Sequence, residues 1–184
     1  MRSLKKLIFL LIIVFNLQNC SKESLNETDS TTTISVKLNG TNSQYEEVWI
    51  EITDVLIKVI DNESIPNCWI SLKSADKEIY KHIDITSTED LNLTTGINIP
   101  SGIIYELKLV IGEGNSLVIN GKSLDLNTNA IYQSESASRI EKNLKSNNHY
   151  RFNLEFDTDN SILESPIENY YILQPSIRTT METL

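Results

Sequence analysis

The chain has few of the residues on which catalytic and metal centres usually depend. Its 184 residues include two cysteines and two histidines, so a Ser-His-Asp or Cys-His site would have to use His82 or His149. Positive charge is also scarce, with 16 Lys and Arg against 25 Asp and Glu and a formal charge of −9. Because Lys and Arg supply most of the affinity for phosphates, this balance argues against a nucleic-acid partner. No set of residues along the chain predicts an active site, and we expect no enzymatic activity.

The N-terminal apolar run is too short to cross a bilayer. It extends from Leu7 to Phe15, whereas a transmembrane helix needs about 20 apolar residues. Three basic residues precede it, and a basic start followed by a short apolar run is typical of a secretory signal peptide. Such signals normally end in small residues of A-x-A type, yet the first alanine of the chain is Ala75. The residue at the expected cleavage site is Cys20.

The segment Leu17-Gln18-Asn19-Cys20 resembles the lipobox of bacterial lipoproteins, in which a leucine lies three residues before a lipidated cysteine. The resemblance implies that residues 1–19 are a signal peptide and that lipid on Cys20 attaches the protein to a membrane. Asn19 departs from the small residue usual in the motif, so an uncleaved anchor and ordinary cleavage nearby stay open as alternatives. Attachment by acyl chains, at about 0.8 kcal/mol per buried CH₂, needs no basic patch on the protein.

The rest of the chain divides into a tether and one domain. Removal of residues 1–19 also removes three positive charges, which changes the formal charge from −9 to −12. Residues 20–32 are polar apart from Leu25 and are expected to form a flexible tether. Residues 33–184 suit a single domain. With Cys20 lipidated, Cys68 has no partner for a disulfide, and its apolar surroundings predict a buried and inert thiol.

Apolar residues after the tether recur with a period of two, which is typical of half-buried β-strands. The segments with this pattern or with short apolar runs are 34–38, 48–59, 69–72, 79–85, 105–111, 117–126, 150–156 and 170–178. The apolar phase changes at Thr53 and Asp54, which indicates a β-bulge or a break between two strands. Asn120-Gly121 supplies the positive φ angles of a tight hairpin turn. About nine short strands predict an all-β fold, an antiparallel β-sandwich.

Residues 135–145 are ambiguous, because Ile140 and Leu144 have helical spacing and Glu141 and Lys145 could form an ion pair on one helix face. The residues themselves allow one short helix here and leave the choice between helix and strand open.

Several motifs, in this order along the chain, resemble the bacterial lipoprotein family catalogued as domain of unknown function 4382. They are Val48–Val55, Ile99-Pro100-Ser101-Gly102, Ile119-Asn120-Gly121, Phe156-Asp157 and Tyr171–Arg178. The resemblance covers roughly residues 33–178. It implies a transthyretin-like or immunoglobulin-like sandwich in an envelope lipoprotein, and a loop or strand rather than a helix at 135–145. The family has no established activity to transfer.

Four aromatic residues are the candidates for a binding surface, because exposed aromatic rings stack on sugars and anchor protein partners. They are Trp49, Tyr105, Tyr170 and Tyr171. Trp49 alternates with the apolar set and is expected to lie on the polar face of its strand. Tyr105 alternates in phase with Leu107 and Leu109, which predicts that it faces the core.

Two weaker patterns suggest metal ions. His82 and Asp84 lie two residues apart on an expected strand and therefore share a face, where they could supply two ligands to zinc. Asp157, Asp159 and Ser161 form an oxygen-rich stretch suited to calcium, although the full EF-hand pattern is absent. Without a metal, the first pair is an exposed strand face and the second is a polar turn.

These features predict a non-enzymatic binding or structural module, attached to the bacterial outer membrane and facing the cell surface, with a protein or glycan as its ligand. Two alternatives stay open. A carboxylate- or metal-dependent glycan hydrolase would need a pocket that holds several of His82, Asp84, Asp157 and Asp159. A periplasm-facing accessory to envelope assembly would need no pocket.

Overall fold

The computed structural model describes residues 30–41, 43–72, 80–86, 90–128, 136–166 and 170–184, with only the backbone of residues 80–83. Within these ranges there are thirteen β-strands and one short 3₁₀ helix, and no helix is long and apolar enough to span a membrane. The strands are β1 (Thr31–Gly40), β2 (Glu47–Lys58), β3 (Trp69–Ser71), β4 (Tyr80–Asp84), β5 (Leu91–Pro100), β6 (Gly102–Ile111), β7 (Ser116–Ile119), β8 (Lys122–Thr128), β9 (Ala137–Leu144), β10 (His149–Phe156), β11 (Ile162–Glu164), β12 (Tyr171–Leu173) and β13 (Ile177–Thr183), and the 3₁₀ helix is η2 (Asp159–Ser161).

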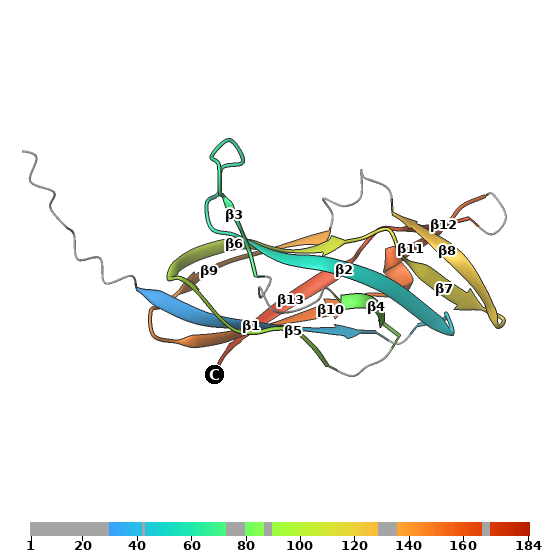
Figure 1. The fold of residues 1–184 in the computed structure, drawn as a ribbon, viewed down its shortest axis with the longest axis horizontal. Helices are drawn as coiled ribbons and strands as arrows, with labels where there is room; N and C mark the ends of the chain where they lie inside the picture. Colours follow the sequence, from blue (N-terminus) through green and yellow to red (C-terminus); the bar gives the residue numbers. More distant parts are fainter. Residues whose placement is uncertain (1–29, 42, 73–79, 87–89, 129–135, 167–169) are drawn as a thin grey trace, which may run out of the picture.

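The strands form two sheets that pack as a β-sandwich (Figure 1). The smaller sheet has the strand order β13-β10-β1-β5. The larger sheet has the order β11-β12-β8-β7-β2-β6-β9, and β3 and β4 also pair with β2. The long strand β2 is central, because β3 and β4 pair with one of its edges while β6 and β7 pair with the other.

The predicted all-β sandwich is confirmed, with two differences in detail. Thirteen strands are present in the described residues instead of about nine. The sheets are also mixed rather than purely antiparallel, since β1 pairs in parallel with β10 and β12 with β8. Two parallel strands cannot be joined by a tight hairpin and need a longer crossover connection. For β1 and β10 the connection passes through the larger sheet, because the chain leaves that sheet after β9 and enters the smaller sheet at β10.

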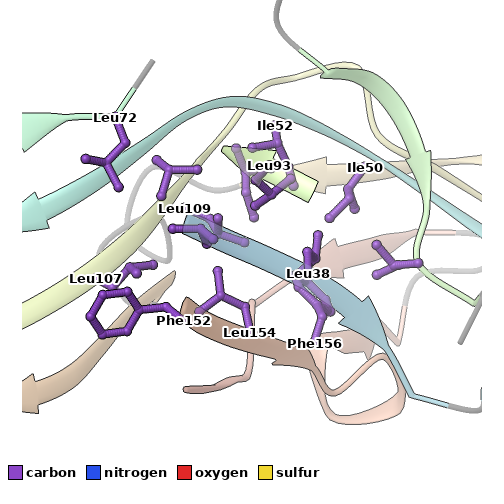
Figure 2. Close-up of a cluster of buried hydrophobic side chains, with 14 of the residues drawn as sticks. Leu38, Ile50, Ile52, Leu72, Leu93, Leu107, Leu109, Phe152, Leu154 and Phe156 are labelled. Carbon is purple, nitrogen blue, oxygen red and sulfur yellow. The ribbon is translucent and has the colours of Figure 1, made fainter. Parts of the chain in front are cut away.

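The core lies between the sheets and is built from the alternate residues of each strand. Phe152, Leu154 and Phe156 of β10 are fully buried and face the side chains of β2 and β6 (Figure 2). Their intervening neighbours are less buried, as expected when successive side chains point to opposite faces. Burying each such side chain contributes about 1.5–3 kcal/mol, so this alternation is what selects the register of the strands.

Strand β2 contains the predicted bulge. Its pairing with β6 shifts between Ile52 and Asp54, and the strand continues through the shift as one element. Val48, Ile50 and Ile52 are buried before it, and Val55 and Ile57 are buried after it. The extra residue therefore lets the apolar side chains of both halves of the strand point into the core.

Residues 137–144, which the local pattern left ambiguous, form the edge strand β9, in agreement with what the family resemblance implies. One prediction about a strand face is wrong. The pairing of β6 with β9 shifts between Ile104 and Glu106, so Ile104 takes the buried position and Tyr105 is only half-buried. This shift comes from pairing between distant strands, which local periodicity does not contain.

The two ends of the sandwich differ in what they carry. We call the end that contains the start of β1 the near end and the opposite end the far end. At the near end the Asn147 amide donates to the Thr31 carbonyl, and the Leu184 amide, at the C-terminus, donates to the His149 carbonyl. The far end holds Gly40, η2 and the β7–β8 hairpin (Figure 1). Strand β1 begins at Thr31, two residues before the predicted start of the domain.

Candidate functional site

The four predicted aromatic candidates do not form one cluster. Tyr171 is buried in the core, and burial together with the nearby Glu164 carboxylate raises the pKa of its phenol. Tyr170, the preceding residue, is 41% exposed. Tyr105 is half-buried on β6. Trp49 lies on the outer face of β2, because its neighbours Val48 and Ile50 face the core, and its side chain is half-buried there.

The residues proposed for calcium are close in sequence but bind other partners. The Asp157 carboxylate accepts from the backbone and side-chain amides of Asn160 at 3.2 and 2.8 Å. Oδ1 of Asp159 accepts from the Ser43 hydroxyl and the Gln44 amide, both at 3.0 Å. Ser161 is fully buried, and its hydroxyl donates to the Asp157 carbonyl. These oxygens shape the turn after β10.

The proposed zinc pair lies on β4. His82 belongs to this strand, and its side chain lies outside the described part of the structure. Oδ1 of Asp84 accepts from the amide and the hydroxyl of Thr86, at 2.9 and 2.7 Å. Among the side chains that the structure describes, no three His, Cys, Asp or Glu lie together as a metal site would require.

A shallow polar pocket of about 420 Å³ lies beside η2. Its lining residues are Asn160, Gln174, Pro175, Ser176 and Ile177. Of the residues named for the hydrolase alternative, the three whose side chains the structure describes, Asp84, Asp157 and Asp159, do not line this pocket. The carboxylates of Asp84, Asp157 and Asp159 instead accept hydrogen bonds from backbone amides, which is a structural role.

One polar pair, Ser35 and His149, could not be predicted from local patterns in the chain. The Ser35 hydroxyl lies 2.9 Å from Nε2 of His149 and also accepts from the Gly96 amide at 3.1 Å. A serine hydrogen-bonded to a histidine is the first element of a catalytic pair. Ser35 is only 6% exposed, however, so its oxygen is not accessible to a substrate. The contact links β1 to both of its neighbours, and His149 begins β10 rather than lying in a loop.

The arrangement around Trp49 is the most suited to binding. Directly opposed residues on neighbouring strands share a face, and one row across four strands contains Asp84, Trp49, Ser116 and Asp125. Glu47 and Glu51 lie on the same face two residues before and after Trp49. We call these six residues the Trp49 face: Glu47, Trp49, Glu51, Asp84, Ser116 and Asp125.

Four of the six residues of the Trp49 face are carboxylates, and three of them accept local hydrogen bonds, Asp84 from Thr86 as described above. Oε2 of Glu47 accepts from the Trp49 indole N–H at 2.7 Å, which fixes the ring against its own strand. Oε2 of Glu51 accepts from the Gly114 amide at 3.0 Å. No ion pair of the described side chains involves any of these four carboxylates. The negative charge around Trp49 is therefore uncompensated within the described part of the chain.

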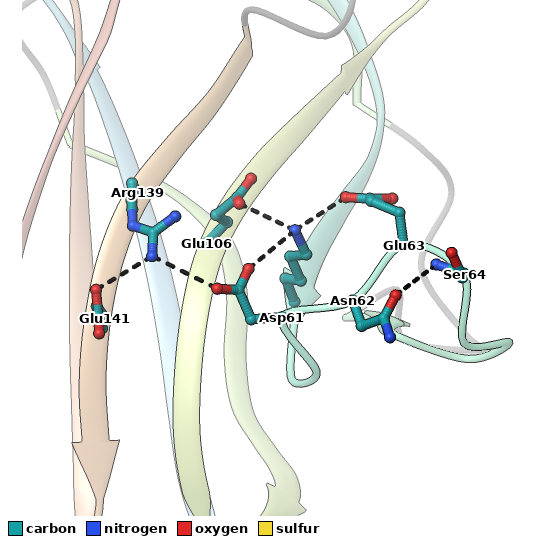
Figure 3. Close-up of polar contacts among 8 residues, drawn as sticks. Asp61, Asn62, Glu63, Ser64, Glu106, Arg139 and Glu141 are labelled. Atoms are coloured by element: carbon teal, nitrogen blue, oxygen red, sulfur yellow. Dashed lines mark hydrogen bonds and ion pairs between the residues drawn. The ribbon is translucent and has the colours of Figure 1, made fainter.

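The second tryptophan, Trp69, also lies near carboxylates but differs in having two lysines beside its ring. The ammonium groups of Lys108 and Lys58 lie 5.1 and 5.8 Å from the centre of the Trp69 ring. Lys58 is buried and forms ion pairs with Asp61, Glu63 and Glu106 at 3.4, 2.9 and 3.1 Å (Figure 3). Hydrogen bonds to Glu63 and Glu106 raise the pKa of the Lys58 ammonium, so it stays charged. Lys58 thus has its partners within the protein, and the ion pairs attach the β2–β3 connection to β6.

Comparison with known proteins gives a family and nothing narrower. No curated protein and no solved structure matches the chain. A family model described as "Domain of unknown function (DUF4382)" matches residues 31–175, from the first residue of β1 to the segment between β12 and β13. The predicted resemblance is confirmed, and the chain belongs to the DUF4382 family.

Proposed function

We propose that this protein is a lipoprotein of the bacterial envelope, attached through Cys20, whose β-sandwich acts as a non-enzymatic binding module at the cell surface. The attachment rests on the N-terminal sequence, with its basic start, its short apolar run and its cysteine at the cleavage site. The binding role rests on the outer sheet surface around Trp49.

The observation that carries the proposal is the position of the Trp49 face relative to the start of the domain. Strand β1 runs from Thr31 at the near end to Gly40 at the far end, which corresponds to about 33 Å for ten residues. Gly40 contacts Ile85, which directly follows Asp84 of the Trp49 face. A lipid attached on the N-terminal side of Thr31 therefore leaves the Trp49 face at the end away from the attachment point.

The test compares the two cysteines in intact cells of the source bacterium. Cys20→Ala is expected to abolish incorporation of labelled fatty acid and to move the protein from membranes into soluble fractions. Cys68→Ala is the matched control, because it removes the other, buried thiol and leaves the lipidation motif intact. A Cys20→Ala protein that remains membrane-bound would refute lipid attachment.

Exposure to protease added outside the cells determines the side of the membrane. Loss of the protein from intact cells supports the surface module. Protection until the outer membrane is disrupted would overturn the surface placement and favour the periplasm-facing accessory instead.

A further inference from the structure

We propose that the Trp49 face binds a positively charged protein segment, one that presents Lys or Arg side chains to the tryptophan ring and to the surrounding carboxylates. This inference rests on the proposed function, since it names the chemistry of the partner that the binding module takes. It is argued from charge complementarity between the face and its occupant.

The first argument is geometric. Neighbouring strands lie about 4.8 Å apart, so Asp84 on β4 is one strand from Trp49, and Asp125 on β8 is two strands away on the opposite side. Glu47 and Glu51 lie along the strand, about 7 Å in each direction. The ring is thus surrounded by carboxylates in both directions of the sheet, at spacings that the side chains of an extended basic segment can match.

The second argument comes from the comparison of the two tryptophans. Trp69 has two lysine ammonium groups within 6 Å of its ring centre, supplied by the protein itself. No such contact is formed by Trp49 among the described side chains, and the charges around it are negative. A ring surrounded by uncompensated carboxylates attracts cations through both its π-face and the carboxylates. The described side chains of the Trp49 face therefore offer a Lys or Arg side chain both an aromatic ring and carboxylates, and supply no cation of their own.

The third argument concerns selectivity. Polar Ser116 is directly opposite Trp49 on β7 and half-buried Val118 is opposite Glu47, so the surface offers apolar contact together with charge. Like charges at an interface are strongly unfavourable, so an acidic partner or an anionic lipid would be repelled. A neutral glycan could stack on the ring and donate hydroxyl hydrogen bonds to the carboxylates, but it carries no positive charge to balance theirs.

The experiment uses the full-length protein in detergent and three probes. They are a fluorescent peptide of alternating lysine and serine, the same peptide with glutamate in place of lysine, and a set of neutral oligosaccharides. We expect binding of the lysine peptide alone, and we expect added salt to weaken it because exposed charges are screened beyond about 8 Å at physiological ionic strength.

Two pairs of substitutions separate the Trp49 face from general acidity. The test pair, Glu47→Gln with Asp125→Asn, removes two charges from the face and still leaves an acceptor for the indole N–H. The control pair, Glu141→Gln with Glu155→Gln, removes the same charge elsewhere on the surface. We expect the test pair to weaken binding about tenfold, the usual scale for charged contacts at an interface, and the control pair to change it less than about twofold.

Trp49→Ala and Trp69→Ala provide the second comparison. Loss of lysine-peptide binding with Trp49→Ala but not with Trp69→Ala supports the proposal, and circular dichroism verifies that both variants are folded. Equal losses with the two charge pairs, or no binding of the lysine peptide, would overturn it. So would oligosaccharide binding that requires Trp49 and is unaffected by the test pair. None of these results depends on lipidation of Cys20, so the two proposals can fail separately.

Discussion

At the scale of single residues, Gly40 is the position with the least space. A Cβ atom built there would lie 1.5 Å from the carbonyl oxygen of Ile85. The same oxygen accepts from the hydroxyl of Thr158 at 3.3 Å, and the amide of Thr158 donates to the hydroxyl of Thr41. Three separate segments thus meet at the far end of β1, and only glycine allows the backbones to approach so closely.

Gly40→Ala is therefore expected to destabilise the protein by about 3 kcal/mol or more, the upper range for inserting atoms into a packed region. Gly121→Ala is the control, because nothing lies near its Cβ position and the cost is only that of its φ of +69°, about 1–2 kcal/mol. Urea denaturation of both variants measures the difference. Equal destabilisation would mean that the Gly40–Ile85 approach does not restrain the fold.

The polar residues of the turns follow a common pattern. The carboxylates of Asp84, Asp157 and Asp159 each accept from backbone amides within their own or a neighbouring loop. Asp side chains in turns often do this, because they replace a backbone acceptor. From sequence alone, such residues cannot be distinguished from metal ligands, since both uses place carboxylates at short intervals in a polar loop.

At the scale of elements, the edge strand β13 depends on an ion pair with β10. Arg151 donates to Glu182 at 2.9 Å, and Arg151 and Glu182 are directly opposite in the register. The hydrogen bond from Arg151 lowers the pKa of the Glu182 carboxyl in the folded protein. A lowered pKa stabilises the fold above the ordinary pKa of glutamate, and this contribution disappears as the pH falls through the lowered value.

We expect Arg151→Ala to reduce stability near neutral pH and to leave a smaller difference from the native protein in strong acid. Arg178→Ala is the matched control, because it removes the same charge at the β13–β10 pairing without a hydrogen bond to Glu182. Thermal denaturation as a function of pH tests this. A destabilisation by Arg151→Ala that stays constant down to strong acid would contradict the assigned role of Glu182.

The elements also show how far the sequence could predict the fold. The bulge in β2 and the Asn120-Gly121 hairpin were predictable, because each depends on a few adjacent residues. The parallel pairing of β1 with β10 was not, since it joins residues more than a hundred positions apart. The Trp49 face was predictable only in part. Alternation placed Trp49 outward, but the positions of Asp84 and Asp125 beside it depend on the register of β4, β7 and β8.

At the scale of the whole molecule, the sandwich is stabilised without a disulfide among the described residues. Cys68 is a free thiol and only 6% exposed. The core between the sheets is apolar and continuous, from the strands of the near end to β12 at the far end. Packing of the two sheets, and not a covalent bond, must therefore supply the stability.

Reducing agents are accordingly expected to leave the melting temperature unchanged. In the lipidated protein, a thiol reagent should label no cysteine in the folded state and Cys68 alone after denaturation. Mass spectrometry of the labelled protein distinguishes the two states, with Cys68→Ala as the unlabelled control. Rapid labelling of Cys68 in native buffer would show that the region around β3 opens easily.

The parallel pairing of β1 with β10 has a consequence for how the chain folds as it is synthesised. The first strand of the domain lies between β5 and β10, so its second partner, residues 149–156, is made more than a hundred residues after it. Contacts between such distant segments form slowly, because a long loop must close before they are gained. The smaller sheet can therefore close around its first strand only after β10 has left the ribosome, so β1 must wait for its partner while most of the domain is made.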